Sequence, residues 1–159
     1  MSVAELVQYI EDNSLNQPEA QALMAGIMLD TKNFVLKTGV RTFEAAAYLR
    51  SCGADTVEVK RMFSDSIETY KAKYEIVSQA EIFNGCAIAF TDKEFPNVRI
   101  SSAQAADELL SIKGVNASFV IFPTDNVVNV SARSLGDINV QLIMEVLGGG
   151  GHLTMAGAQ

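Results

Sequence analysis

The stretch Gly148-Gly149-Gly150-Gly151-His152, near the end of this chain of 159 residues, organises the interpretation of the rest of the sequence. Four consecutive glycines bury no side chain and lose more backbone entropy on folding than other residues would. A folded domain keeps such a run where the backbone approaches another group closely or adopts dihedral angles that other residues avoid. Glycine-rich turns also direct several N–H groups to one point, which suits phosphate oxygens. The run therefore predicts an anion site, with the chain's only histidine beside it.

Polar side chains lie shortly before the glycines. The segment Ser131-Ala132-Arg133-Ser134 ends an alternating strand, and Asp137-Ile138-Asn139 opens a short apolar helix. That helix points its negative C-terminal end at the glycines, which repels phosphate. An anion would therefore rely on the loop N–H groups and on the start of the helix expected after Thr154. The alternative stays open that Gly148 is an ordinary helix C-cap and that the other glycines are turn residues.

The composition is that of a soluble α/β protein, with 48% apolar and 19% charged residues. No apolar run reaches the length of a membrane span, and the first residues do not form a signal peptide. Cys52 and Cys86 are expected to be free thiols, and with one histidine they cannot complete a tetrahedral zinc site. A net charge of −7 without a basic run argues against general binding to long nucleic acid.

The first half of the chain is predicted to be helical, and the second half to contain a sheet. Helices are expected over residues 3–10, from Pro18 to 29, and over 43–51, 57–63 and 66–81. Thr42 is the expected N-cap of the third helix, and Asp55 and Thr56 start the fourth. Strands are expected over residues 86–90, 117–122 and 127–131, with a helix over 103–110 capped by Ser101 and Ser102. This order describes an α/β chain in which a small mixed sheet, with helices packed on it, follows a helical part.

Asp30 ends the second helix, which is apolar on nearly all sides and is therefore predicted to be buried. A carboxylate at the end of a buried helix needs a partner. Two interpretations remain open on spacing alone: Asp30 caps the next turn, or it ligates a metal ion.

Two parts of the sequence resemble motifs of a known family. Residues 26–34 and 37–46 resemble the last conserved motif of the DHH-family phosphoesterases. Residues 131–134, 139–140 and 147–152 resemble the substrate-binding motif of the DHH-associated domain. The resemblance covers essentially the whole chain, and the membrane-anchored, GdpP-type cyclic di-AMP phosphodiesterases of Firmicutes are the subgroup it most resembles. It implies that residues 1–82 are the C-terminal helical part of a DHH domain with linker helices, and that residues 83–159 are a DHH-associated domain truncated at its C-terminus.

The resemblance implies metal-assisted hydrolysis of a phosphodiester, in which two Mn²⁺ ions activate a bridging hydroxide. Asp30 matches the family's final metal-ligating aspartate, and is thus the expected catalytic and metal-binding residue. Substrate phosphate contacts are implied for Arg133 and for the loop, and further polar contacts for two serines and an asparagine. The expected substrate-binding residues are Arg133, Ser131, Ser134, Asn139, Gly148, Gly149, Gly150, Gly151 and His152.

The Asp-His-His motif that gives the family its name is absent here, as is its early motif with one histidine and two aspartates. One carboxylate cannot hold two metal ions, so we expect a piece of an enzyme that binds no Mn²⁺ tightly and is inactive alone. Its expected partners are a cyclic dinucleotide or short oligonucleotide and the rest of the catalytic domain; a homodimer stays open. The parent is expected to be anchored in the membrane, with this soluble part on the cytoplasmic side, and to act in signalling.

Several functions therefore remain open at this point. The first is hydrolysis of cyclic di-AMP to a linear dinucleotide by the complete protein. The second is hydrolysis of nanoRNA or other oligonucleotides by a phosphoesterase or exonuclease of the same family. The third is a nucleotide-binding module without chemistry, and the last is an interaction domain in which the glycines are only turns.

Overall fold

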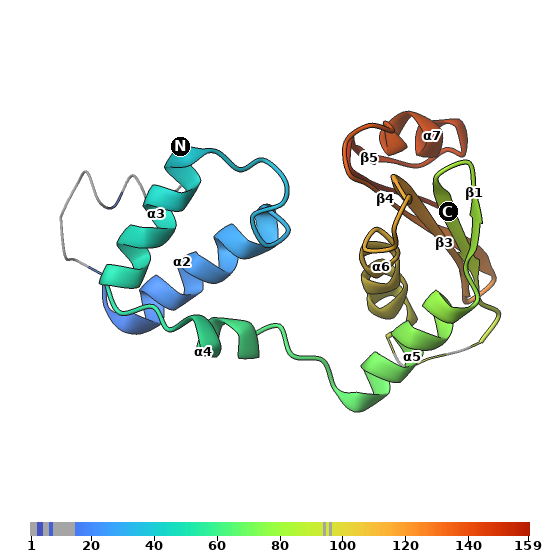
Figure 1. The fold of residues 1–159 in the computed structure, drawn as a ribbon. Coiled ribbons are helices and arrows are strands. Elements are labelled where there is room, and N and C mark those ends of the chain that lie inside the picture. Colours follow the sequence, from blue (N-terminus) through green and yellow to red (C-terminus); the bar gives the residue numbers. More distant parts are fainter. Residues whose placement is uncertain (1–2, 5–6, 8–14, 94, 96) are drawn as a thin grey trace. The chain divides into compact units, whose positions relative to one another are not determined.

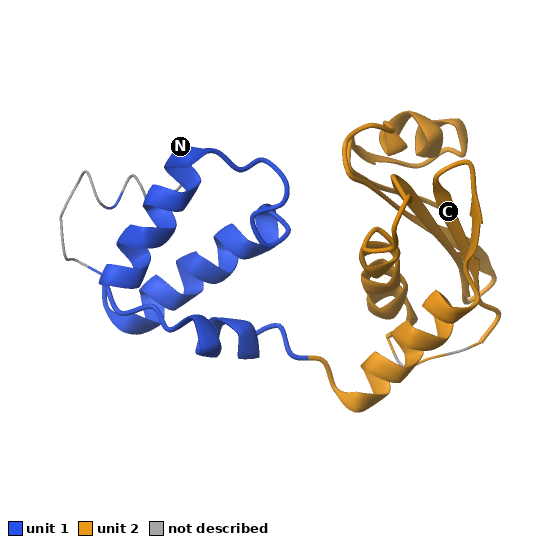
Figure 2. Ribbon diagram, viewed as in Figure 1, with its two compact units in different colours: residues 1–64 blue, residues 65–159 orange. Residues whose placement is uncertain are grey.

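The computed structural model describes residues 3–4, 7, 15–93, 95 and 97–159. It divides into two compact units, residues 1–64 and 65–159 (Figure 2). Most of the helix predicted over residues 3–10 lies outside the described residues. The helix α5, Ile67–Ser78, belongs to the second compact unit, whereas the sequence groups it with the linker helices of residues 1–82. The predicted domain boundary at 82/83 stays a prediction, because a compact unit is not the same thing as a family domain.

The first unit contains α2, α3 and α4, whose bounds are Gln17–Asp30, Val40–Ser51 and Thr56–Arg61 (Figure 1). Asn16 caps α2 in a reciprocal box with Glu19, and Asp55, expected at the start of the next-but-one helix, is the N-cap of α4. Gly39, not Thr42, is the N-cap of α3, and the Thr42 hydroxyl accepts a hydrogen bond from the Gly39 N–H at 3.3 Å. The helical half is thus confirmed in the described residues, with small shifts at the helix ends. The helix predicted over 66–81 is too long, because it ends at Ser78 and Glu81 already belongs to a strand.

The prediction that α2 is buried is wrong for this chain. Within α2 only Ala20 and Met24 are buried, and Leu29 is 61% exposed. Among the described elements α2 contacts α3 and α4, and these contacts leave apolar residues such as Leu29 exposed. Apolar residues on all sides of a helix predict burial only where other elements surround it.

A left-handed turn follows α2. Lys32, Asn33 and Phe34 have φ values of 49°, 56° and 64°, and Lys37 follows with φ 52°. The carbonyl of Thr31 accepts hydrogen bonds from the N–H groups of residues 35 and 36, both at 2.8 Å. Phe34 stacks on Phe43 of α3, with ring centroids 5.3 Å apart. These contacts offset a conformation that costs roughly 1–2 kcal/mol for each non-glycine residue.

Lys37→Gly is expected to raise the free energy of unfolding of the first unit by about 0.5 kcal/mol, because glycine adopts a positive φ without the Cβ clash. The matched control is Lys60→Gly in α4, where the same exchange should lower the free energy of unfolding by about 1 kcal/mol. Urea unfolding monitored by circular dichroism measures both. Equal effects of the same sign would show that φ at residue 37 is not strained.

The second unit is built on one six-stranded mixed sheet (Figure 1). Its strands, in chain order, are β1 Glu81–Phe83, β2 Cys86–Phe90, β3 Ala117–Thr124, β4 Val127–Ser134, β5 Gly150–His152 and β6 Met155–Ala158. The spatial order is β1-β2-β3-β4-β6-β5; β2 and β3 are parallel, and every other neighbouring pair is antiparallel. The predicted mixed sheet with helices packed on it is therefore confirmed.

Helices cover both faces of this sheet. One core joins α5 and α6, Val98–Leu109, to β2 and β3 through Ile76, Leu109 and Val120. The other joins α7, Val140–Val146, to β3, β4 and β6 through Ala117, Ala132 and Met144. Because successive strand residues point to opposite faces, Ala117 and Val120 of β3 serve different cores.

Two further features of the second unit differ from the sequence prediction. The helix α6 begins at Val98, so Ser101 and Ser102 lie buried inside it and are not its caps. Strand β2 is buried only at its two alanines. Apolar side chains stay exposed on the first two strands, namely Ile82 and Phe83 of β1 and Ile88 and Phe90 of β2.

None of the helices in the described ranges is long and apolar enough to cross a membrane.

Candidate functional site

The first glycine of the run ends α7. Gly148 has φ 79°, its N–H donates to the carbonyl of Glu145 at 3.0 Å, and the N–H of Gly149 donates to the carbonyl of Met144 at 2.8 Å. These two bonds form a Schellman motif, in which a left-handed residue just after the helix satisfies its last carbonyls. The C-cap that the sequence offers as one role of Gly148 is therefore present.

The next glycines form a strand packed tightly on its neighbour. Gly150–His152 is β5, and a two-residue turn connects it to β6. A Cβ on Gly149 would lie 2.1 Å from the carbonyl oxygen of Gly157, and one on Gly151 would lie 2.5 Å from Cα of Ala156. The close backbone approach expected from the sequence is real, and the other group is the chain's own β6. The helix expected after Thr154 is absent from the described residues because Met155–Ala158 pairs between β4 and β5 instead.

The strand register brings predicted residues together. Arg133 of β4 lies opposite Met155 of β6, which lies opposite His152 of β5. Two residues along β4, on the same face of the sheet, Ser131 lies opposite Gly157, which lies opposite Gly150. Two positions of this second row are glycines, so no side chain fills the sheet surface beside Ser131.

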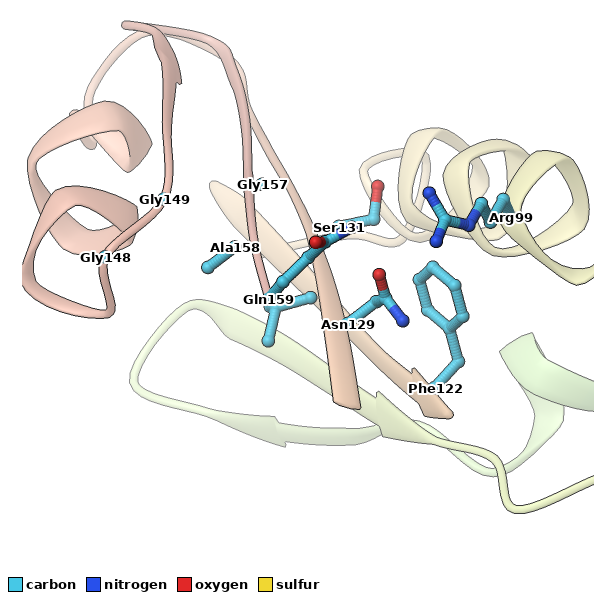
Figure 3. A pocket seen from close by; sticks show the side chains of 10 residues that line it. Arg99, Phe122, Asn129, Ser131, Gly148, Gly149, Gly157, Ala158 and Gln159 are labelled. Atoms are coloured by element: carbon cyan, nitrogen blue, oxygen red, sulfur yellow. The ribbon is translucent and has the colours of Figure 1, made fainter. Parts of the chain in front are cut away.

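A pocket of about 460 Å³ lies on this part of the sheet, beside Ser131 and Gly157. Its lining includes Ser131, Gly148 and Gly149, three of the predicted residues, and also Arg99 of α6. Figure 3 shows the Arg99 guanidinium reaching from α6 toward the side chains of Ser131 and Asn129. The remaining lining residues are Phe122, Asn129, Val130, Gly157, Ala158 and Gln159. A guanidinium, a hydroxyl and an amide around a glycine floor suit an anionic ligand.

Arg133 is not among the residues that line this pocket, and its side chain is hydrogen-bonded within the protein. The residue is 7% exposed. Its Nε donates to Oδ1 of Asp107 on α6 at 3.2 Å, and its Nη1 donates to the Ser131 hydroxyl at 3.2 Å and to the Ala132 carbonyl at 2.9 Å. Arg133 therefore connects α6 to the pocket through Ser131.

With this geometry in place, comparison with known proteins shows what the chain resembles. Residues 87–159 match the DHHA1 domain. The chain as a whole also aligns with much longer proteins. It is 51% identical over 162 residues to the cyclic-di-AMP phosphodiesterase PdeA of Listeria monocytogenes and 46% identical over 164 residues to the cyclic-di-AMP phosphodiesterase GdpP of Bacillus subtilis. These alignments cover 99% of the chain and 24% and 25% of those relatives, so the chain spans about a quarter of their length.

A solved structure supports the fold of this chain. An exopolyphosphatase-related protein from Bacteroides fragilis matches with a TM-score of 0.87 and 22% sequence identity, over 99% of this chain and 49% of that one. The resemblance indicated by the motifs around Asp30 and His152 is confirmed by the DHHA1 match and by the sequence likeness to the cyclic-di-AMP phosphodiesterases. At this identity the structural match concerns the fold alone.

Other predicted substrate residues lie outside the pocket lining. Ser134 is buried, and its hydroxyl accepts a hydrogen bond from the Gly136 N–H at 3.0 Å. Asn139 caps α7 by accepting from the N–H groups of residues 141 and 142. Gly150, Gly151 and His152 lie on β5, where the histidine side chain is exposed. Their roles as substrate contacts stay predictions.

Asp30 lies in the first unit as the exposed last residue of α2. Its predicted burial is wrong, for the reason given for α2. Across the part of the chain that the structure describes, no three His, Cys, Asp or Glu side chains gather where they could hold a metal ion. A pair of Mn²⁺ ions needs several such ligands, so the donor groups of this chain do not fit them without residues from elsewhere.

Proposed function

We propose that this chain is the substrate-binding part of a phosphodiesterase that hydrolyses cyclic di-AMP to a linear dinucleotide. The observation that carries the proposal is that Ser131, Gly148 and Gly149 line one pocket with the Arg99 guanidinium. The likeness to proteins named cyclic-di-AMP phosphodiesterases, at 46–51% identity over nearly the whole chain, supplies the substrate class. His152 and Gly150, in the adjoining part of the hairpin, complete the proposed phosphate-binding surface.

The proposed division of labour leaves the bond cleavage to residues beyond this chain. Asp30 is proposed as one metal ligand of a site that the rest of the catalytic domain completes. On its own the chain is proposed to be inactive and to bind Mn²⁺ weakly, because a single exposed carboxylate loses little hydration and gains few ligands by binding. The parent is proposed to be membrane-anchored, with this part on the cytoplasmic side.

Charge favours a small ligand over a long nucleic acid. The chain carries a net charge of −7, so its overall field repels polyanions. Arg99 is exposed and supplies positive charge within the pocket lining. A local cation in an acidic protein suits a compact group such as one phosphodiester. The second candidate, a short oligonucleotide, shares that chemistry.

Titration of cyclic di-AMP and its linear product into the ¹⁵N-labelled chain, to millimolar ligand, tests the proposal. Wild type is expected to bind with shifts at residues 131, 148 and 149. Arg99→Ala is expected to weaken binding about tenfold or more, since a hydrogen bond to a charged group contributes roughly 1.5–3 kcal/mol. His152→Ala is expected to weaken it as well. Lys113→Ala, which removes an exposed charge outside the pocket lining, serves as the control and should change the affinity less than twofold.

The alternatives give different results in the same titration. No binding by wild type would contradict the proposed substrate site. Binding to adenine oligonucleotides but not to cyclic di-AMP would favour the oligonucleotide substrate. A non-catalytic nucleotide module would bind tightly without Mn²⁺ and would be unaffected by Asp30→Asn both here and in the complete protein. In the complete protein, the proposed enzyme would lose hydrolysis with that variant.

A further inference from the structure

The ion pair between Arg133 and Asp107 is the feature that the proposed function leaves unexplained. Arg133 donates from Nε to the carboxylate and from Nη1 to both the Ser131 hydroxyl and the Ala132 carbonyl. Its side chain is 9% exposed, whereas that of Asp107 is 34% exposed. A guanidinium held at two of its nitrogens and largely shielded from solvent is poorly placed to reach a ligand directly.

Hydrogen-bond polarity at Ser131 follows from this arrangement. Arginine is a donor only, so the Ser131 oxygen must act as the acceptor of the Nη1–H bond. The hydroxyl proton then points away from Arg133 and is free to donate. Ser131 lines the pocket, so a ligand bound there can receive this proton. A hydroxyl fixed as a donor recognises an acceptor-only group such as a phosphate oxygen.

The charges of the Arg133–Asp107 pair also argue against a direct contact between Arg133 and an anionic ligand. Asp107 carries the charge opposite to that of Arg133 at 3.2 Å, so the pair exerts little net attraction on an anion. Arg99, on the first turn of the same helix, is the guanidinium that lines the pocket. Attraction of the ligand and orientation of the serine are therefore separate tasks, which fall to two different arginines.

We infer that Asp107 is a positioning residue of the substrate site: it holds Arg133, and Arg133 fixes the Ser131 hydroxyl as a hydrogen-bond donor to a substrate phosphate. Arg133 itself makes no substrate contact. This inference rests on the proposed function and changes the role that the sequence assigns to Arg133, from a direct contact to a group acting through Ser131.

A double-mutant cycle tests the inference. Affinity for cyclic di-AMP is measured by the NMR titration for wild type, Ser131→Ala, Asp107→Asn and the double variant. Each single variant is expected to weaken binding about three- to tenfold. In the double variant, Asp107→Asn should add less than twofold to the loss caused by Ser131→Ala, because the route through the hydroxyl is already gone. Asp107→Glu is expected to restore part of the lost affinity by renewing the carboxylate.

Two controls keep structural damage apart from positioning. Asp92→Asn removes an exposed carboxylate from the same unit and should leave affinity unchanged. Thermal unfolding and the amide spectrum of each variant check that the sheet is intact. Arg133→Lys keeps the charge but cannot donate from the same fork, and its effect should likewise vanish in the Ser131→Ala background.

The outcomes separate the two claims. Multiplicative losses in the double variant, with wild type binding normally, overturn the inference and leave the proposed function intact, since Arg133 and Ser131 would then contact the ligand independently. Stronger binding by Asp107→Asn also overturns the inference, because Asp107 would then compete with the ligand for Arg133. Absence of wild-type binding overturns the proposed function, and the inference falls with it.

Discussion

Gly149→Ala is expected to lower the free energy of unfolding of the second unit by about 3 kcal/mol or more. The added Cβ would lie 2.1 Å from the carbonyl oxygen of Gly157, 2.6 Å from Cα of Ala158 and 2.7 Å from its Cβ. Backbone atoms cannot rotate away as a flexible side chain can, so β5 must move off β6. The pairing of these strands, and with it the position of His152, would be lost.

The next glycine provides a matched control for this prediction. A Cβ on Gly150 would meet none of the described atoms within 4 Å, outside its own chain neighbours, and φ of Gly150 is not in the left-handed region. Gly150→Ala is therefore expected to leave the free energy of unfolding unchanged or to raise it by up to about 1 kcal/mol, because alanine loses less backbone entropy. Urea unfolding of both variants gives the comparison. Equal stabilities for the two would mean that β5 does not approach β6 as closely as described.

Ile76→Ala is expected to lower the free energy of unfolding of the second unit by about 2–5 kcal/mol, the usual result of emptying a fully buried aliphatic site. Ile76 is fully buried on α5, in the core that contains Leu109 and Ala87. Asp65 strengthens the attachment of α5, since it accepts from Gln104 of α6 at 2.8 Å and pairs with Lys73 at 3.3 Å. The loss is therefore expected in the unit that contains the sheet.

Differential scanning calorimetry compares this variant with Leu49→Ala, which empties an equally buried site in the core of the first unit. Each substitution should lower the transition of its own unit by several degrees. The comparison also decides where α5 belongs. A shift of the first unit's transition by Ile76→Ala would support the predicted boundary at 82/83 and contradict the division at 64/65.

The fold was predictable from sequence where local chemistry decides it. Side-chain caps at Asp55, Ser66 and Asn139 mark the starts of three helices, and Gly148 marks the end of the last one. The hairpin of β3 and β4 follows from two alternating strands with turn residues between them. In these cases a few neighbouring residues contain the whole signal.

The edge of the sheet was not predictable in the same way. Strand β5 consists of two glycines and a histidine, and Met155–Ala158 has small residues that favour no one structure. Their pairing with β4 depends on the rest of the sheet being present, which local patterns do not encode. The prediction that α2 is buried is wrong for a related reason, because the apolar character of a helix does not show whether another element covers that helix.

The candidate site was predicted in part. The motif residues Ser131 and Gly149 line the pocket, because β4 and the glycine hairpin are neighbours in the sheet. The sequence does not predict Arg99 as a pocket residue, because no local pattern around it indicates that it lies beside β4. The pairing of Arg133 with Asp107 spans 26 residues and joins a strand to a helix. A contact of that kind follows from the packing of α6 on the sheet, and no spacing in the sequence predicts it.

The edge strand β1 has a practical consequence for the ligand titrations. Strand β1 lies at the edge of the sheet, where its free N–H and C=O groups can pair with another molecule, and Phe83 beside them is 69% exposed. Repulsion between molecules of charge −7 opposes that contact, and added salt screens the repulsion within about 10 Å at 0.1 M. Ionic strength thus acts on self-association and on ligand affinity at the same time. Dilution of the protein at constant salt separates the two, because only self-association depends on protein concentration.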